Sequence, residues 1–130
     1  MAKILIIDDD SDIVEAMRVV LENKGYGVVS AENGKDGLIK ASLEKPELII
    51  LDVMMPGIDG FEVARELKKN VVVKNIPILM LTAVKKKTGF DFKAEAGDPD
   101  WLPVDDYCDK PLDYEVLLER VAVLISRSKL

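Results

Sequence analysis

The chain has 130 residues, enough for one domain with its own core, and 48% of them are hydrophobic against 32% charged. The formal net charge of −6 argues against nucleic acid as a direct partner, and the absence of histidine excludes histidine catalysis, histidine metal ligands and phosphohistidine. The lone Cys108 permits no internal disulfide, and the apolar run 4–7 is too short for a signal peptide or a membrane span. These features predict a cytoplasmic protein without a membrane partner.

Three predicted strands and two predicted helices fill the first half of the chain. Strands are expected at 3–7, 26–30 and 48–52, and the first and third are apolar runs of the kind that parallel sheets bury on both faces. After the first strand, Asp10 or Ser11 can cap a helix that ends at Gly25. The next helix is expected to begin at Asn33-Gly34 and to bury three larger apolar side chains: Leu38, Ile39 and Leu43.

The second half of the chain adds two strands and two helices. Asp59 and Glu62 form a capping box at the start of a helix. Its buried stripe is expected to contain Phe61, Val63, Ala64 and Leu67. Strands are predicted at 78–81, followed by Thr82, and at 106–109, followed by Lys110-Pro111. The last helix is expected from about 113 to 127, with one apolar stripe.

Five strands that alternate with helices predict the α/β class. We expect a doubly wound, five-stranded parallel sheet with helices on both faces. Right-handed crossovers leave few topologies, and the flavodoxin-like order 2-1-3-4-5 fits the length of the chain. In this order the carboxyl ends of strands one, three, four and five form one row, where open α/β sheets place their ligands.

Polar residues with complementary chemistry follow the strands of that row. Asp8 and Asp9 follow strand one, Asp52 ends strand three, Thr82 follows strand four and Lys110 follows strand five. Three close carboxylates repel one another unless a cation neutralises them, and Mg²⁺ prefers such oxygen ligands. A carboxylate, a metal, a lysine and a hydroxyl are the groups that phosphoryl transfer needs. Asp52 is the expected nucleophile, because carboxylates form aspartyl phosphates.

Together these motifs resemble the receiver domain of two-component response regulators. The resemblance covers essentially the whole chain, with its motifs in the right order. The segments that carry it are Asp8-Asp9, Asp52 with Met54-Met55-Pro56-Gly57, Leu81-Thr82-Ala83 and Asp109-Lys110-Pro111. It implies a stand-alone receiver at 1–130 with no output domain, because the chain ends after the last helix.

The resemblance also implies a role for each motif residue. Asp52 would accept a phosphoryl group from a sensor histidine kinase or a phosphotransfer protein in a Mg²⁺-dependent reaction. The implied metal ligands are Asp8, Asp9, Asp52 and the backbone carbonyl of Met54. Thr82 would be the switch hydroxyl, Lys110 would contact the phosphoryl oxygens and Tyr107 would be the switch aromatic. The domain would catalyse only its own phosphorylation and dephosphorylation, as a monomer or a phosphorylation-dependent dimer.

Two departures from the family pattern bear on the output surface and on phosphoryl lifetime. The interval between Thr82 and Lys110 is longer than usual, so the surface of strand four, helix four and strand five, which binds an output partner in receivers, is expected to be irregular here. Only a short helix at 90–96 is predicted in this interval, with Trp101 folded back as a plug. The apolar Met54 and Val84 cannot orient a water, which predicts slow self-dephosphorylation.

Other interpretations of the acids fit less well. Asp8, Asp10 and Asp12 imitate the start of a calcium loop, but Ile13 and Val19 stand where that loop needs glycine and glutamate. Asp10 is instead expected to be a helix cap or a surface acid. A haloacid-dehalogenase-like phosphatase would need a second aspartate in place of Met54, and its nucleophile would end the first strand. A receiver fold locked for structural interaction remains a third, weaker alternative.

Overall fold

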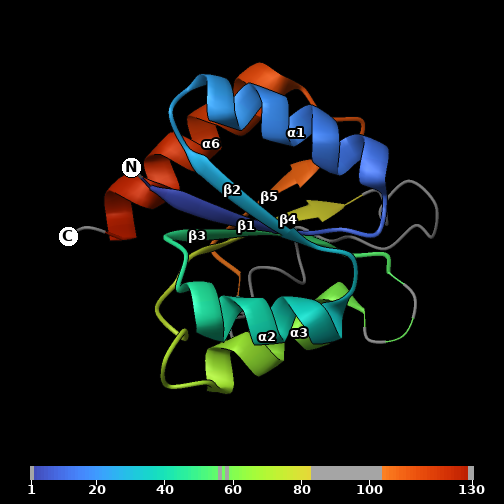
Figure 1. Ribbon diagram of the computed structural model, residues 1–130, viewed down its shortest axis with the longest axis vertical. Helices are drawn as coiled ribbons and strands as arrows, with labels where there is room; N and C mark the ends of the chain where they lie inside the picture. The colour runs from blue at the N-terminus through green and yellow to red at the C-terminus, as the bar shows by residue number, and fades with distance from the viewer. Residues whose placement is uncertain (1, 56, 58, 83–103, 129–130) are drawn as a thin grey trace.

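The computed structural model describes residues 2–55, 57, 59–82 and 104–128 (Figure 1). These residues form five strands and four helices. In chain order they are β1 (Lys3–Ile7), α1 (Ser11–Asn23), β2 (Gly27–Ala31), α2 (Gly34–Glu44), β3 (Leu48–Asp52), α3 (Gly60–Lys69), β4 (Ile78–Thr82), β5 (Asp106–Asp109) and α6 (Tyr114–Ser128).

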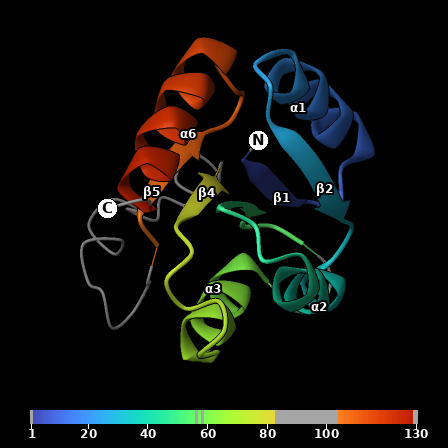
Figure 2. The ribbon, with the colours of Figure 1, turned by 60° about the vertical axis from the view of Figure 1, so that its left-hand side comes forward.

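The strands form one parallel sheet in the order β2-β1-β3-β4-β5. Helices α1 and α6 cover one face of the sheet, and α2 and α3 cover the other (Figures 1 and 2). The predicted α/β class, strand order and two-sided helical cover are therefore confirmed. The parallel arrangement brings the carboxyl ends of all five strands to one edge, as the register of Ile7 beside Leu51 and of Asp52 beside Leu81 shows.

The central strands are buried on both faces, which explains their uninterrupted apolar sequences. Alternate side chains enter opposite layers, so that Ile6 and Ile50 pack under α1 and α6. Ile7 and Leu51 pack on the other side, under α2 and α3. Because all of these side chains are fully buried, the tightly packed sheet holds the residues that follow each strand in fixed positions.

The buried face of α2 differs from the prediction. The helix turns Gly34, Gly37 and Ala41 toward the sheet, whereas Ile39 and Leu43 are 51% and 74% exposed. The expectation that these two side chains are buried was wrong, and Leu38 is only partly buried. The reason is the close approach of the helix, because a Cβ on Gly37 would lie 2.5 Å from the side chain of Ile7.

Most other boundaries lie within a residue of the predicted ones, although α1 ends at Asn23, two residues before Gly25. The second strand occupies 27–31 rather than 26–30, and the last helix begins at Tyr114, after Asp113 accepts a hydrogen bond from the backbone N–H of Glu115. Half of the capping box predicted for α3 is present, because the side chain of Asp59 accepts from the N–H of Glu62. The Glu62 carboxylate instead accepts from Arg65. Residues 83–103, which include the short helix expected at 90–96, lie outside the described residues.

The outer edge of β2 is occupied by two basic side chains. Arg18 of α1 donates from Nη1 to the carbonyl of Val28 over 3.0 Å and from Nη2 to the hydroxyl of Ser30 over 3.1 Å. Lys40 of α2 donates to the carbonyl of Ser30. Because β2 pairs with β1 alone among the described strands, these cations satisfy carbonyls that the sheet leaves open.

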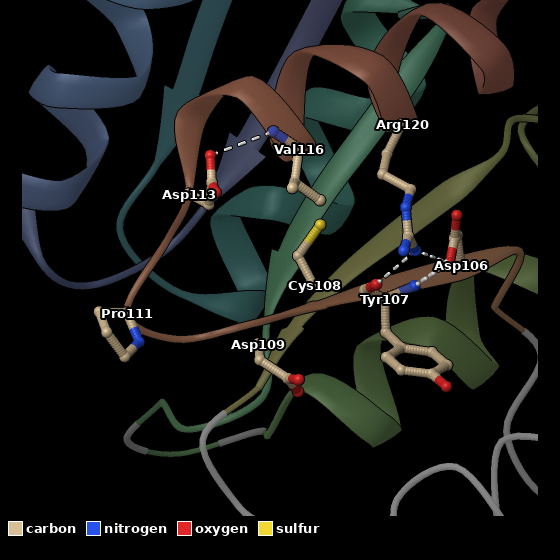
Figure 3. Close-up of a pocket in the computed structure, with 8 residues that line it drawn as sticks. All are labelled: Asp106, Tyr107, Cys108, Asp109, Pro111, Asp113, Val116 and Arg120. Carbon is tan, nitrogen blue, oxygen red and sulfur yellow. Dashed lines mark hydrogen bonds and ion pairs between the residues drawn. The ribbon is translucent and has the colours of Figure 1, made fainter.

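The opposite edge, along β5, is closed in the same way (Figure 3). Arg120 of α6 donates to the carbonyl of Tyr107 over 3.1 Å and forms a 2.7 Å ion pair with Asp106. The Asp106 carboxylate in turn accepts from the backbone N–H of Tyr107. Helix α6 is therefore linked to the edge strand through side-chain contacts with its backbone.

Candidate functional site

The carboxyl edge of the sheet brings together the predicted polar residues. Asp8 follows β1, Asp52 is the last residue of β3, Thr82 is the last residue of β4 and Lys110 follows β5. Asp8, Thr82 and Asp52 are only 1%, 2% and 3% exposed. The backbone N–H of Lys110 donates to the carbonyl of Thr82 over 2.9 Å, which fixes the end of β5 beside the end of β4.

Three carboxylates form a cluster at this edge. One oxygen from each of Asp8, Asp9 and Asp52 lies within 4.8 Å of the other two. Asp8 and Asp52 are buried, whereas Asp9 is exposed, so the cluster opens toward solvent on one side. A set of oxygen donors with this spacing and negative charge suits a hard divalent cation such as Mg²⁺.

Lys110 reaches into this cluster. Its ammonium Nζ lies 2.9 Å from Oδ1 of Asp52 and 3.6 Å from Oδ2 of Asp8. Burial opposes the charge on the lysine, but its hydrogen bond to Asp52 and the negative charges of Asp52 and Asp8 outweigh burial and raise the pKa of Lys110. The lysine is therefore a fixed positive charge beside the carboxylate expected to react.

Asp8 is under electrostatic strain. Burial, supported by the charge of Asp52, raises the pKa of the Asp8 carboxyl to about 6, against the lowering effects of the Asp10 backbone N–H and of Lys110. Oδ1 of Asp8 accepts from that N–H over 2.9 Å, while Oδ2 is buried without a hydrogen-bond partner among the described residues. An orphaned carboxylate oxygen beside two other acids is what a metal ligand needs, so the donor set fits Mg²⁺.

Gly60 determines how closely α3 approaches the reacting strand. Its N–H donates to the carbonyl of Val53 over 2.9 Å, and a Cβ at this position would lie 2.2 Å from the backbone oxygen of Asp52. The sequence interpretation missed this role. The available signal was the glycine directly after the capping residue Asp59. The first position of a helix usually accepts a side chain, so a glycine there can indicate a close approach to another segment.

The remaining predicted site residues surround this group. Met54 follows β3 with a side chain that is 57% exposed, so an apolar surface borders the acids. Tyr107 lies on β5 and packs, partly buried, against the core layer under α2 and α3. The metal-ligand role of the Met54 carbonyl and the switch roles of Thr82 and Tyr107 stay predictions, and Val84 lies outside the described residues.

A separate cavity of about 280 Å³ lies between β5 and α6 (Figure 3). Its lining contains none of the three clustered acids and combines charged side chains with apolar ones. The residues that line it are Asp106, Tyr107, Cys108, Asp109, Pro111, Asp113, Val116 and Arg120.

Within the described part of the chain, no helix has the length and apolar character to cross a bilayer.

Comparisons with known proteins agree with this geometry. The family model of the response regulator receiver domain matches residues 4–122. The chain is 39% identical to the alkaline phosphatase synthesis transcriptional regulatory protein PhoP of Bacillus subtilis, over 98% of this chain and 50% of PhoP. It is 34% identical to protein PilH of Pseudomonas aeruginosa, over 97% of this chain and 99% of PilH. The chain thus spans about half the length of PhoP and nearly all of PilH.

Solved structures show the same fold. A putative response regulator from Chloroflexus aurantiacus superposes with a TM-score of 0.83 and 32% identity, covering 96% of this chain and 98% of that one. The chemotaxis protein CheY4 of Vibrio cholerae gives a TM-score of 0.83 and 30% identity, covering 95% and 98%.

Receiver domains are signalling domains rather than classical enzymes. They act in phosphorylation-based two-component systems, interact with histidine kinases or phosphotransfer proteins and bind Mg²⁺ in an acidic pocket. The acid cluster, the strand order and the match over residues 4–122 fit this description together. The chain belongs to the family of response regulator receiver domains.

Proposed function

We propose that Asp52 accepts a phosphoryl group from a phosphohistidine of a sensor histidine kinase or a phosphotransfer protein. One observation carries the proposal: a buried carboxylate at the end of a central strand lies 2.9 Å from a lysine ammonium and within 4.8 Å of two other acids. This environment keeps Asp52 beside positive charge at a place that a phosphoryl group can reach.

Mg²⁺ is the proposed cofactor of this reaction. Asp8, Asp9 and Asp52 would hold it, with the backbone carbonyl of Met54 as a further ligand. The buried Oδ2 of Asp8, which has no hydrogen-bond partner among the described residues, and the raised pKa of its carboxyl support this assignment, because Lys110 at 3.6 Å does not fully offset the charge of the clustered acids. When bound, the ion supplies the positive charge that offsets the acids and the phosphoryl oxygens.

The residues of the chain then have distinct tasks in the transfer. An oxygen of Asp52 attacks the phosphorus, a new P–O bond forms, and the P–N bond to the donor imidazole breaks. The electron pair of the broken bond stays on the leaving imidazole. Lys110, which already contacts Asp52, is placed to contact the transferred phosphoryl oxygens and to hold them in one orientation.

The acyl phosphate is proposed to switch a surface made of β4, the predicted fourth helix and β5. The Thr82 hydroxyl would move toward the phosphoryl group, and Tyr107 would change rotamer with it. Support comes from their placement, since Thr82 ends β4 beside Asp109 of β5 and Tyr107 pairs with Met80 of β4. An output protein would read this surface, with the domain a monomer or a phosphorylation-dependent dimer.

Intact-mass measurement after incubation with acetyl phosphate tests the proposal. The wild type should gain one phosphoryl group with Mg²⁺ and little or none in EDTA. Asp52→Asn should gain none, whereas Asp109→Asn, which changes an exposed acid at the end of neighbouring β5, should label normally. Unchanged labelling of Asp52→Asn would refute the assignment. Steady release of inorganic phosphate from a phosphomonoester would instead favour the phosphatase alternative.

A further inference from the structure

Asp10, the third acid after β1, does not join the carboxylate cluster. It is the N-cap of α1, with backbone angles φ −89° and ψ 102°. Its exposed side chain accepts from the N–H groups of Asp12 and Ile13 over 3.0 Å and 3.3 Å. Its carbonyl accepts from the N–H of Val14 over 3.0 Å, so that residue 10 is held to the first turn of the helix by three hydrogen bonds.

The same residue also contacts the proposed metal site through its backbone. The N–H of Asp10 donates to Oδ1 of Asp8 over 2.9 Å. This hydrogen bond occupies Oδ1 of the Asp8 carboxylate. The other oxygen, Oδ2, has no hydrogen-bond partner among the described residues and lies 3.6 Å from Nζ of Lys110. The orientation of Asp8 therefore depends on where the backbone of residue 10 is held.

We propose that Asp10 is a positioning residue for the metal site. Its side-chain cap fixes the backbone N–H that orients the Asp8 carboxylate, so that Oδ2 faces the pocket. This inference rests on the proposed Mg²⁺ function. Hydrogen bonds to a ligating carboxylate typically change metal affinity about 10–100-fold when they are lost. Without the cap, the first turn of α1 frays, and the N–H of residue 10 no longer holds Asp8 in one orientation.

Two other roles for Asp10 fit the structure less well. A direct ligand would lie in the cluster, which contains Asp8, Asp9 and Asp52 instead. A purely electrostatic role would work through an exposed charge, which solvent and salt screen. The two roles also predict different effects of an asparagine at this position, because asparagine keeps the capping oxygen and removes the charge.

Calorimetric titration of the metal-free protein with MgCl₂ tests the proposal. Asp10→Ala should bind Mg²⁺ about tenfold more weakly than the wild type, and Asp10→Asn should stay within about twofold. Asn33→Ala is the matched control, because Asn33 caps α2 through a 2.8 Å hydrogen bond from the Asp36 N–H, outside the acid cluster. Without Mg²⁺, both alanine variants should lower Tm by a similar amount, about 3–5 °C.

The outcomes separate this inference from the proposed function. Wild-type affinity in Asp10→Ala would overturn the positioning role while leaving the proposed function intact. A tenfold loss in Asp10→Asn would assign the effect to charge, and a comparable loss in Asn33→Ala would assign it to general destabilisation; either result overturns the inference. A wild type that binds no Mg²⁺ would refute the proposed function and the inference together.

Discussion

Replacing Asp8 with asparagine is expected to stabilise the metal-free protein at neutral pH. The carboxyl of Asp8 is 1% exposed, close to Asp52, and its pKa is raised from 3.8 to about 6. Such a carboxyl binds its proton more tightly in the folded protein than in the unfolded chain. Its favourable contribution is therefore fully present below the unfolded pKa of 3.8 and is lost as pH rises through the folded pKa of about 6.

The expected size of the effect follows from the two pKa values. A shift of about two units at about 1.4 kcal/mol per unit costs the folded wild type about 3 kcal/mol at about pH 7.5. At about pH 5 the carboxyl is mostly protonated in the folded state, and the cost falls to about 1.5 kcal/mol. Asparagine is neutral at both pH values. The free energy of unfolding of Asp8→Asn should therefore exceed that of the wild type by these amounts.

Urea denaturation in EDTA at the two pH values measures this gap in the free energy of unfolding between Asp8→Asn and the wild type. Glu119→Gln is the control, because it removes the same charge from an exposed site on α6 and should change stability by less than about 0.5 kcal/mol. Added Mg²⁺ should narrow the gap, since it stabilises only the wild type, by about 1.4 kcal/mol at ten times its Kd. A gap that does not change with pH, or a variant less stable than the wild type at neutral pH, would refute the reasoning.

Three further predictions concern neighbouring residues. Gly60→Ala places a Cβ 2.2 Å from the backbone oxygen of Asp52, so it should lower the free energy of unfolding by about 1–3 kcal/mol in urea denaturation and slow acetyl phosphate labelling. Lys110→Ala removes a cation 2.9 Å from Asp52; calorimetry should show retained Mg²⁺ binding, while labelling slows about tenfold or more. Burial raises the pKa of the Cys108 thiol to about 11, so a thiol reagent at about pH 8 should modify only the unfolded protein. Unimpaired labelling of the first two variants, or rapid modification of the native cysteine, would contradict these expectations.

The sequence predicted the strands and the placement of the polar residues at one sheet edge because both depend on local signals that the fold preserves. Asp52 ends an apolar run and Lys110 follows a short strand, and parallel pairing then brings them to one edge. The prediction of which face of α2 is buried was wrong. Hydrophobicity favoured Ile39 and Leu43, whereas the helix packs on the sheet through smaller residues. The role of Gly60 was missed for a related reason, since a close approach between separate segments leaves no local pattern.

The occupied edges of the sheet restrict how this domain can associate with other proteins. Arg18 and Lys40 on one side, and Arg120 on the other, already donate to outward carbonyls of the border strands. An incoming strand would have to displace these cations before it could extend the ladder. Partners are therefore expected to recognise helices and loops, and recruitment need not carry the risk of open-ended polymerisation.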